Sequence, residues 1–145
     1  FPYTTLFRSA LQGVPYDYLG KIFTRLSRAG LVISTEGKGG GFKLARPAEL
    51  ISVLDVAHAI DGEKNMFECR EVRQRLAVFD EAPPAWVCDG PCGVRSVMDS
   101  AQQRMEEELA RHTILDLARK MYRKAPDTFQ IEVQEWISVR RSSSQ

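Results

Sequence analysis

Apolar residues recur every three or four positions between residues 15 and 29, which is the spacing of one buried face of an α-helix. They are Tyr16, Leu19, Ile22, Phe23 and Leu26. Pro15 suits the first turn, where its missing N–H costs nothing, and Gly30 follows the last turn, where glycine is favoured. The sequence therefore predicts a helix over residues 15–29.

Two short apolar runs come after this helix. The run LVIS at 31–34 is rich in β-branched residues, FKLA stands at 42–45, and the glycine-rich GKGGG at 37–41 separates them. This pattern predicts two strands joined by a tight turn. A helix followed directly by a β-hairpin, with basic residues on both, predicts a winged helix-turn-helix. In that fold the helix fits the major groove of DNA and the hairpin, or wing, meets the backbone or minor groove.

The next apolar pattern lies in AELISVLDVAHAIDG, at residues 48–62. Ser52 followed by Asp55 predicts a capped helix start, and Gly62 predicts its end. The helix between them is apolar on most positions, so we expect it to be buried against the wing.

A longer helical stripe lies at residues 93–112. Its members are Val94, Val97, Met98, Ala101, Met105, Leu109 and His112. Little chain remains to cover so long a stripe, so we expect a helix of a second subunit to bury it, with packing inside one chain as the alternative. Thr113 and Asp116 predict a capping pair that starts another helix, at ILDLARKMY.

The pattern changes after Arg123. Phe129, Ile131 and Val133 alternate and predict a strand, although Trp136 and Ile137 break the alternation. The closing RRSSSQ predicts a disordered end. We assign no role to residues 123–145.

Charge separates the chain into two parts. At 145 residues it is one domain or one domain with an appendage, its net charge is +1, and 43% of its residues are hydrophobic. Residues 10–50 hold six basic and three acidic residues, a net charge of +3, whereas residues 51–145 hold 13 and 16, a net charge of −3. A basic half facing phosphate fits this distribution. Neither a membrane-spanning run nor a secretory signal is present, so we expect a cytoplasmic protein.

Three cysteines, Cys69, Cys88 and Cys92, lie in or beside a segment that Pro83, Pro84 and the run 89–91 mark as a loop. Cytosolic thiols more often bind metal or sense redox state than form disulfides. Three thiolates near one loop can hold an iron–sulfur cluster. A redox-sensing thiol and a zinc site remain open, although the lone C-x-x-x-C pair lacks the spacing of a strong zinc site.

The first nine residues, FPYTTLFRS, have no periodicity that joins them to the helix pattern after them. They resemble the translation of a sequencing adapter, and no initiator Met is present. We therefore interpret residues 1–9 as non-native sequence ahead of an N-terminally truncated chain.

Several strings resemble the IscR/NsrR family of bacterial winged-helix transcription regulators. They are YLGKIFTRLSRAGLVIS, GKGGGFKLARPAELISVLDVAHAIDG and CGVRSVMDSAQQRMEEELARHTILDL, and the resemblance covers roughly residues 10 to 120. The resemblance implies a mainly α-helical protein with a small β-hairpin: a partial winged-helix domain at 10–62, a cysteine-bearing sensor loop at 63–92 and dimerisation helices at 93–122.

The resemblance also implies functional residues. DNA contacts are expected from the helix and the wing, at Tyr16, Asp17, Tyr18, Lys21, Arg25, Arg28, Lys38, Gly39, Gly40, Gly41 and Lys43. Cys69, Cys88 and Cys92 are the implied iron–sulfur ligands; Cys92 matches the family pattern well and the other two match it less closely. The fourth ligand is open, because Arg95 stands where some members have His. Asp89, His112 or a small molecule are candidates for that place.

These features favour a homodimeric DNA-binding regulator controlled by an iron–sulfur cluster or by a redox, iron or nitric-oxide signal. The alternatives are a cluster-free winged-helix regulator that senses a metabolite or a partner, and a zinc-stabilised protein-interaction module. An enzyme is not expected. The chain shows no nucleophile–base pair, and GKGGG lacks the Lys-Ser/Thr ending of a phosphate-binding loop.

Overall fold

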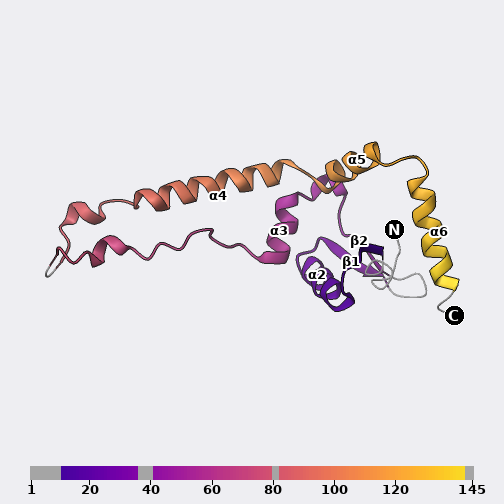
Figure 1. Ribbon diagram of the computed structural model, residues 1–145, viewed down its shortest axis with the longest axis horizontal. Helices are drawn as coiled ribbons and strands as arrows, with labels where there is room; N and C mark the ends of the chain where they lie inside the picture. Colours follow the sequence, from indigo (N-terminus) through magenta and orange to yellow (C-terminus); the bar gives the residue numbers. More distant parts are fainter. Residues whose placement is uncertain (1–10, 36–40, 80–81, 143–145) are drawn as a thin grey trace.

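The computed structural model describes residues 11–35, 41–79 and 82–142. Figure 1 shows a winged-helix unit from which a long arm extends, formed by one long helix and an irregular segment that runs beside it. Two further helices return to the side of the winged-helix unit opposite the arm. The expected fold class, mainly α with one β-hairpin, is confirmed. The predicted non-native segment 1–9 lies outside the described residues.

Helix α2 (Tyr16–Arg28) forms where periodicity predicts it. Leu19 is buried and Ile22 half-buried, so the apolar stripe does face inward. Tyr16 is the exception, with 53% of its surface exposed, because it lies at the border between the apolar and polar faces of the helix. Pro15 occupies the N-cap position rather than the first helical position.

The end of α2 is a complete glycine C-cap. Gly30 has a φ of +67°, the left-handed region that glycine adopts without strain. Its N–H donates to the carbonyl of Ser27, and the N–H of Leu31 donates to the carbonyl of Leu26, each at 3.0 Å. This pair of bonds is the Schellman arrangement, and it turns the chain directly into the first strand.

Strands β1 (Val32–Thr35) and β2 (Gly41–Leu44) pair antiparallel, with Val32 opposite Leu44 and Thr35 opposite Gly41. They lie one residue away from the predicted runs. The predicted turn lies mostly outside the described residues, so Lys38, Gly39 and Gly40 are not described. The hairpin is fixed to α2 by the Phe23 and Phe42 rings, which stack with centroids 4.4 Å apart.

Helix α3 (Val53–Asp61) begins with the predicted cap and ends at Gly62, as expected. The Asp55 N–H donates to the Ser52 hydroxyl at 3.0 Å, and the Ser52 N–H donates to the Asp55 carboxylate at 2.9 Å. The expectation that this helix packs on the wing is wrong. It lies mainly between α2 and α4, and all its described side chains but Asp61 are half-buried rather than fully buried.

Helix α4 (Gly93–Arg111) is the long helix of the arm, and α5 (Ile114–Lys124) begins after a break at His112 and Thr113. Thr113 and Asp116 form the predicted capping box. The two capped helix starts meet: the Val53 N–H donates to the His112 carbonyl at 2.8 Å, and the Ile114 N–H donates to the Ile51 carbonyl at 2.9 Å. Ile51, only 1% exposed, lies at this junction.

The described residues of the segment 63–92 are largely irregular, with two single-turn 3-10 helices, η2 (Val72–Arg75) and η3 (Ala85–Cys88). A third, η1 (Ala48–Leu50), precedes α3. Gln102 of α4 holds the irregular segment in place. Its side-chain oxygen accepts the Met66 N–H at 2.8 Å, and its amide donates to the Lys64 carbonyl at 3.2 Å.

The predicted strand after Arg123 is wrong, because this segment forms helix α6 (Phe129–Ser142). Val133, Trp136 and Ile137 recur at steps of three and four, and Ile137 is 3% exposed, so helical spacing outweighs the short alternation. The helix includes residues 140–142 of the expected disordered end, and the last three residues lie outside the described part. Among the described residues, no helix combines the length and apolar character needed to cross a bilayer.

Candidate nucleic-acid interface and cysteine site

The polar face of α2 is an exposed, mainly basic surface. A shallow hollow on it is lined by Tyr16, Asp17, Gly20, Lys21, Thr24, Arg25 and Arg28. The structure thus brings together five of the six predicted DNA contacts of this helix. Tyr18, the sixth, is 57% exposed on the same helix. Gly20 and Thr24 are additions, and their spacing from Asp17 and Arg28 along one helical face is the signal that identifies them.

Arg25 also has a contact within the chain. Its guanidinium donates to the carbonyl of Ile60, in the last turn of α3. A cation at a helix C-terminus is favoured by the helix dipole. Arg25 therefore fixes α2 against α3 while remaining part of the exposed basic face.

The wing contributes two described candidates. Gly41 pairs with Thr35, whose hydroxyl accepts the Gly41 N–H at 3.1 Å. Lys43 is exposed, and strand alternation puts it on the face opposite Phe42, which stacks on α2. Lys43 is therefore turned away from the packed side of the hairpin.

Two of the three cysteines meet. The Sγ atoms of Cys69 and Cys92 are 3.9 Å apart, and all three cysteines are half-buried free thiols. Two sulfurs bound at about 2.3 Å to one tetrahedral metal ion stand about 3.8 Å apart, so this pair has ligand spacing. Cys92 is also the N-cap of α4, where its sulfur accepts the Arg95 N–H at 3.3 Å.

The third thiol is not part of this pair. Cys88 ends η3, and within the described residues no group of three Cys, His, Asp or Glu side chains converges as a metal site. His112 is excluded as a fourth ligand from the same chain, because it follows the far end of α4, about 30 Å from Cys92. There it bonds to Glu108, at 3.1 Å.

A charged pair that the sequence did not single out stands beside the cysteines. Arg73 binds Glu71 through two bonds of 2.5 and 2.8 Å and donates to the Gly90 carbonyl at 3.1 Å. The Arg73 guanidinium lowers the pKa of Glu71, and the Glu71 carboxylate raises the pKa of Arg73. Cys88 and Cys92 make smaller electrostatic contributions to the rise of the Arg73 pKa. No periodicity marks such residues in an irregular segment.

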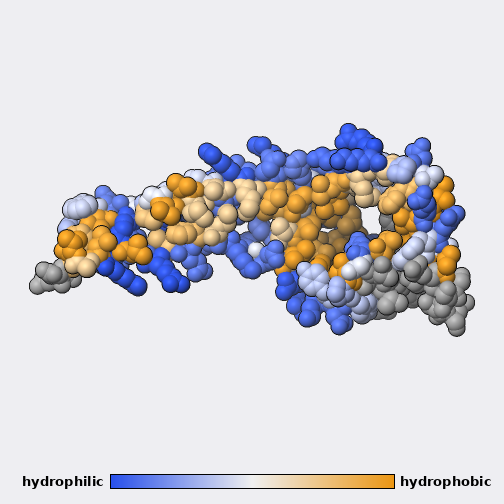
Figure 2. All heavy atoms as spheres, in the orientation of Figure 1, coloured by the Kyte–Doolittle hydropathy of each residue, from blue (hydrophilic) through white to orange (hydrophobic). Residues whose placement is uncertain are grey.

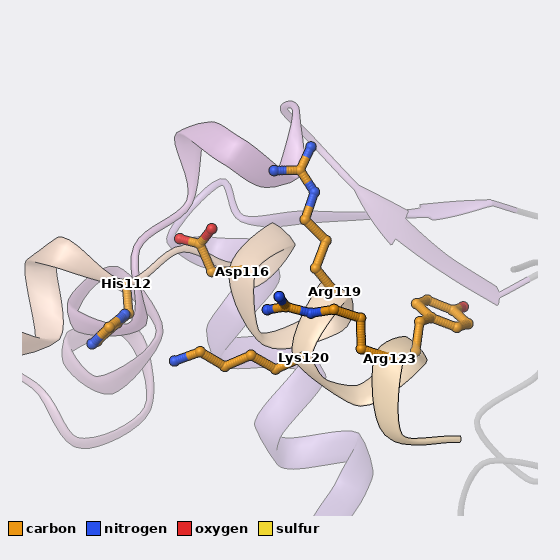
Figure 3. Close-up of a pocket in the computed structure, with 6 residues that line it drawn as sticks. His112, Asp116, Arg119, Lys120 and Arg123 are labelled. Atoms are coloured by element: carbon orange, nitrogen blue, oxygen red, sulfur yellow. The ribbon is translucent and has the colours of Figure 1, made fainter. Parts of the chain in front are cut away.

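A second cluster of cations lies on α5. Figure 3 shows His112, Asp116, Arg119, Lys120 and Arg123 around a hollow between the start of α5 and its later turns. Asp116 belongs to the capping box, where the Thr113 N–H lowers its pKa. Arg119, Lys120 and Arg123 give this face of α5 a basic character.

A helix followed by a β-hairpin, with an exposed basic face on the helix, is typical of winged-helix regulators. Residues 8–120 match the Rrf2 family, described as "Iron-dependent Transcriptional regulator". The chain belongs to the Rrf2 family, which comprises transcriptional regulators rather than enzymes. This finding confirms the resemblance to IscR-type proteins.

Two proteins are similar to this chain in sequence. The chain is 46% identical over 57 residues to "HTH-type transcriptional regulator IscR" of Cereibacter sphaeroides, covering 39% of this chain and 37% of that protein. It is 33% identical over 108 residues to "Protein rrf2" of Nitratidesulfovibrio vulgaris, covering 74% of this chain and 65% of that protein. The chain therefore spans less than two thirds of either relative.

Two solved structures show the same fold. The structure of CymR, the global cysteine regulator of B. subtilis, matches with a TM-score of 0.63 at 22% identity, over 82% of this chain and 79% of CymR. T. potens IscR also has a TM-score of 0.63, at 21% identity, over 90% of this chain and 79% of IscR.

Proposed function

We propose that this chain is a DNA-binding transcription regulator that reads duplex DNA as a homodimer through α2 and the hairpin. The observation that carries the proposal is the exposed face of α2, where Lys21, Arg25 and Arg28 share one surface with a single acid, Asp17. A helix with this face fits the major groove, and its cations neutralise phosphates. Because its proposed ligand is chromosomal DNA, we expect the protein to act in the cytoplasm.

The dimer is proposed from the surface of α4. The half-buried residues of the helix are Met98, Gln102, Glu106 and Leu109, whereas four members of the predicted apolar stripe, Val94, Val97, Ala101 and Met105, are exposed. In that stripe Val94 is 62% exposed, Val97 68% and Met105 44%. Figure 2 shows apolar side chains gathered along the arm. A second copy of the stripe would cover these side chains and set the spacing of two recognition helices.

The surface of the whole chain supports the same proposal. Its solvent-accessible area is 11105 Å². A compact monomer of this mass exposes about 7,500 Å². This excess of exposed area fits an extended arm that packs on a partner.

We propose Cys69, Cys88 and Cys92 as thiolate ligands of an iron–sulfur cluster. Cys69 and Cys92 fit this role by their spacing, and Cys88 is four residues from Cys92 in the same loop. Such a cluster, when bound, supplies a redox- and gas-sensitive centre. These cysteines would hold it at the start of α4, so a change in the loop would act directly on the proposed dimerisation helix.

The connection from the loop to the recognition helix runs through described contacts. Cys92 caps α4, and the far end of α4 is joined to the start of α3 by the Val53–His112 hydrogen bond. Helix α3 packs on α2, where Arg25 binds the Ile60 carbonyl. A shift of α4 is therefore expected to move α2.

The test is a salt titration of DNA binding. The chain, purified without oxygen, is mixed with fluorescent 30-bp duplexes selected from a randomised library (a length of about three helical turns). Affinity should fall steeply as salt rises, and Lys21→Ala should reduce the slope of log K against log salt by about 1. Lys120→Ala, an exposed lysine of α5, is the control. A protein with no salt-sensitive affinity for any selected duplex contradicts the proposal.

A zinc-stabilised protein-interaction module is the second candidate, because the Cys69–Cys92 spacing fits zinc as well as iron. Metal analysis and visible absorbance separate the two. Iron with sulfide and a brown colour support the cluster, whereas colourless protein with bound zinc and no affinity for DNA supports the module.

A further inference from the structure

One side chain connects the two halves of the cysteine loop. Arg73 stands four residues after Cys69, and its guanidinium donates to the carbonyl of Gly90, which lies between Cys88 and Cys92. The other contacts of the same guanidinium go to Glu71, two residues after Cys69. Arg73 therefore connects the segment that carries Cys69 to the segment that carries Cys88 and Cys92.

The local backbone points to a specific geometry. Glu71 has a φ of +46°, and it is the one residue other than glycine with a positive φ among the described residues. This left-handed conformation costs free energy in a residue with a side chain and persists only where surrounding contacts hold it. The two bonds from Arg73 to the Glu71 carboxylate are the described contacts that hold it.

The pair is more than a typical surface salt bridge. The Arg73 side chain is 23% exposed and that of Glu71 is 32% exposed, and both line the groove that also contains Cys69 and Cys92. A forked, partly buried arginine–carboxylate pair fixes geometry in a way that single exposed ion pairs do not. The positive charge of Arg73 also lies within electrostatic reach of Cys88 and Cys92.

We infer that Arg73, oriented by Glu71, is a positioning residue of the cysteine site: it holds Cys69 and Cys92 at ligand spacing. This inference rests on the proposed cysteine site. It assigns Arg73 no direct bond to a metal.

The experiment titrates the metal-free chain with Co²⁺, whose thiolate charge-transfer band reports sulfur ligation without any need for DNA binding. Arg73→Gln should weaken Co²⁺ binding by about 10- to 100-fold, the usual effect of losing a group that orients metal ligands. Arg73→Lys keeps the charge but loses the fork, so it should be impaired nearly as much. Glu71→Gln should also weaken binding, and the combined variant should lose less than the sum of the single losses.

Arg70→Gln is the matched control, because Arg70 lines the same groove and is exposed. It should bind Co²⁺ like the original chain. Far-UV circular dichroism shows whether each variant keeps its helices.

A second measurement tests positioning without metal. In a Cys88→Ser background, a diazene dicarboxamide oxidant accepts two electrons and two protons from the Cys69 and Cys92 thiols, which join as a disulfide. Arg73→Gln should slow disulfide formation several-fold, whereas the rate at which each single thiol is alkylated should change less. If the original chain shows no cobalt–thiolate band, the proposed cysteine site is wrong; if it shows the band and Arg73→Gln binds and cross-links equally well, only the inference about Arg73 is wrong.

Discussion

At the scale of single residues, a stacked aromatic pair joins α2 to the hairpin. Phe23 projects from the half-buried face of α2, and Phe42 projects from β2 onto it, with an interplanar angle of 14°. Stacked rings contribute beyond the area that they bury. The relative position of helix and hairpin, which the proposed DNA contact requires, therefore depends on this pair.

We expect Phe23→Ala and Phe42→Ala each to destabilise the fold, and a double-mutant cycle to show a coupling of about 0.5–1.5 kcal/mol. Urea unfolding followed by circular dichroism measures it. Ile33→Ala, an exposed side chain of β1, is the control and should change the unfolding free energy little. Additive effects of the two Phe variants would show that the rings do not interact.

Helical spacing separated the basic residues of α2 from the apolar stripe, whereas their expected contact with DNA came from the resemblance to the family. The sequence did not predict Arg73, because its partners, Glu71 and the Gly90 carbonyl, are brought together by an irregular backbone. Nor did it show that Cys69 and Cys92 meet while Cys88 stands apart, since sequence spacing fixes no distance in a loop.

At the scale of elements, the start of α3 and the start of α5 form a single junction. Each carries a capping box, and the N-cap residues of the two helices, Ser52 and Thr113, pair as a short antiparallel bridge. The junction joins the winged-helix unit to the end of the arm. Two helices that begin at the same place have their directions set by the same few hydrogen bonds.

We expect Ser52→Ala and Thr113→Ala each to lower the unfolding free energy by about 1 kcal/mol, the usual value of a helix cap. Because the two caps share the bridge, the effects should not be additive. Ser100→Ala, an exposed residue of α4, serves as control. Thermal or urea unfolding measures the variants and the double variant, and strictly additive losses would contradict a shared junction.

Acid should weaken the same junction. The Ser52 N–H lowers the pKa of Asp55, and the Thr113 N–H lowers the pKa of Asp116, both from 3.8. A lowered folded-state pKa stabilises the fold above the unfolded pKa, and this contribution is lost as pH falls through the folded value. The urea concentration at the unfolding midpoint should therefore decrease when the pH is lowered below about 4. Asp55→Asn should remove part of that dependence, and an unchanged pH profile would contradict the assignment.

The elements that the sequence predicted well are those with strong local signals. Periodicity and caps located α2, α3, α4 and α5 to within one or two residues. Helix α6 was misread because Phe129, Ile131 and Val133 alternate over too short a span to distinguish a strand from a helix. The partner of α3 was also misjudged, because an apolar face shows that a helix is covered but not by which element.

At the scale of the whole molecule, the arm carries an uncovered apolar face and a cysteine loop, while the winged-helix unit carries the basic face. The separation puts the proposed sensor and the proposed DNA contact at different ends of α4. The second subunit is expected to lie along this helix.

The same alanine-to-glutamate substitution at two positions of α4 tests that expectation. Ala101 lies in the apolar stripe and Ala110 on the far face of α4, and both are exposed. Ala101→Glu should convert the dimer into a monomer, because it introduces a charge into the proposed interface, whereas Ala110→Glu should not. Sedimentation velocity measures the mass. Equal behaviour of the two variants, or a monomeric original chain, would contradict dimerisation through α4.

The unbroken length of α4 has a mechanical consequence. Its 19 residues make a rigid rod about 28 Å long. Tilting such a rod by about 10° displaces one end by about 5 Å, which exceeds the roughly 3.4 Å rise of one base pair. In the proposed dimer, a small rearrangement beside Cys92 would be amplified by this leverage, and two α2 helices aligned with two half-sites of DNA would lose that alignment.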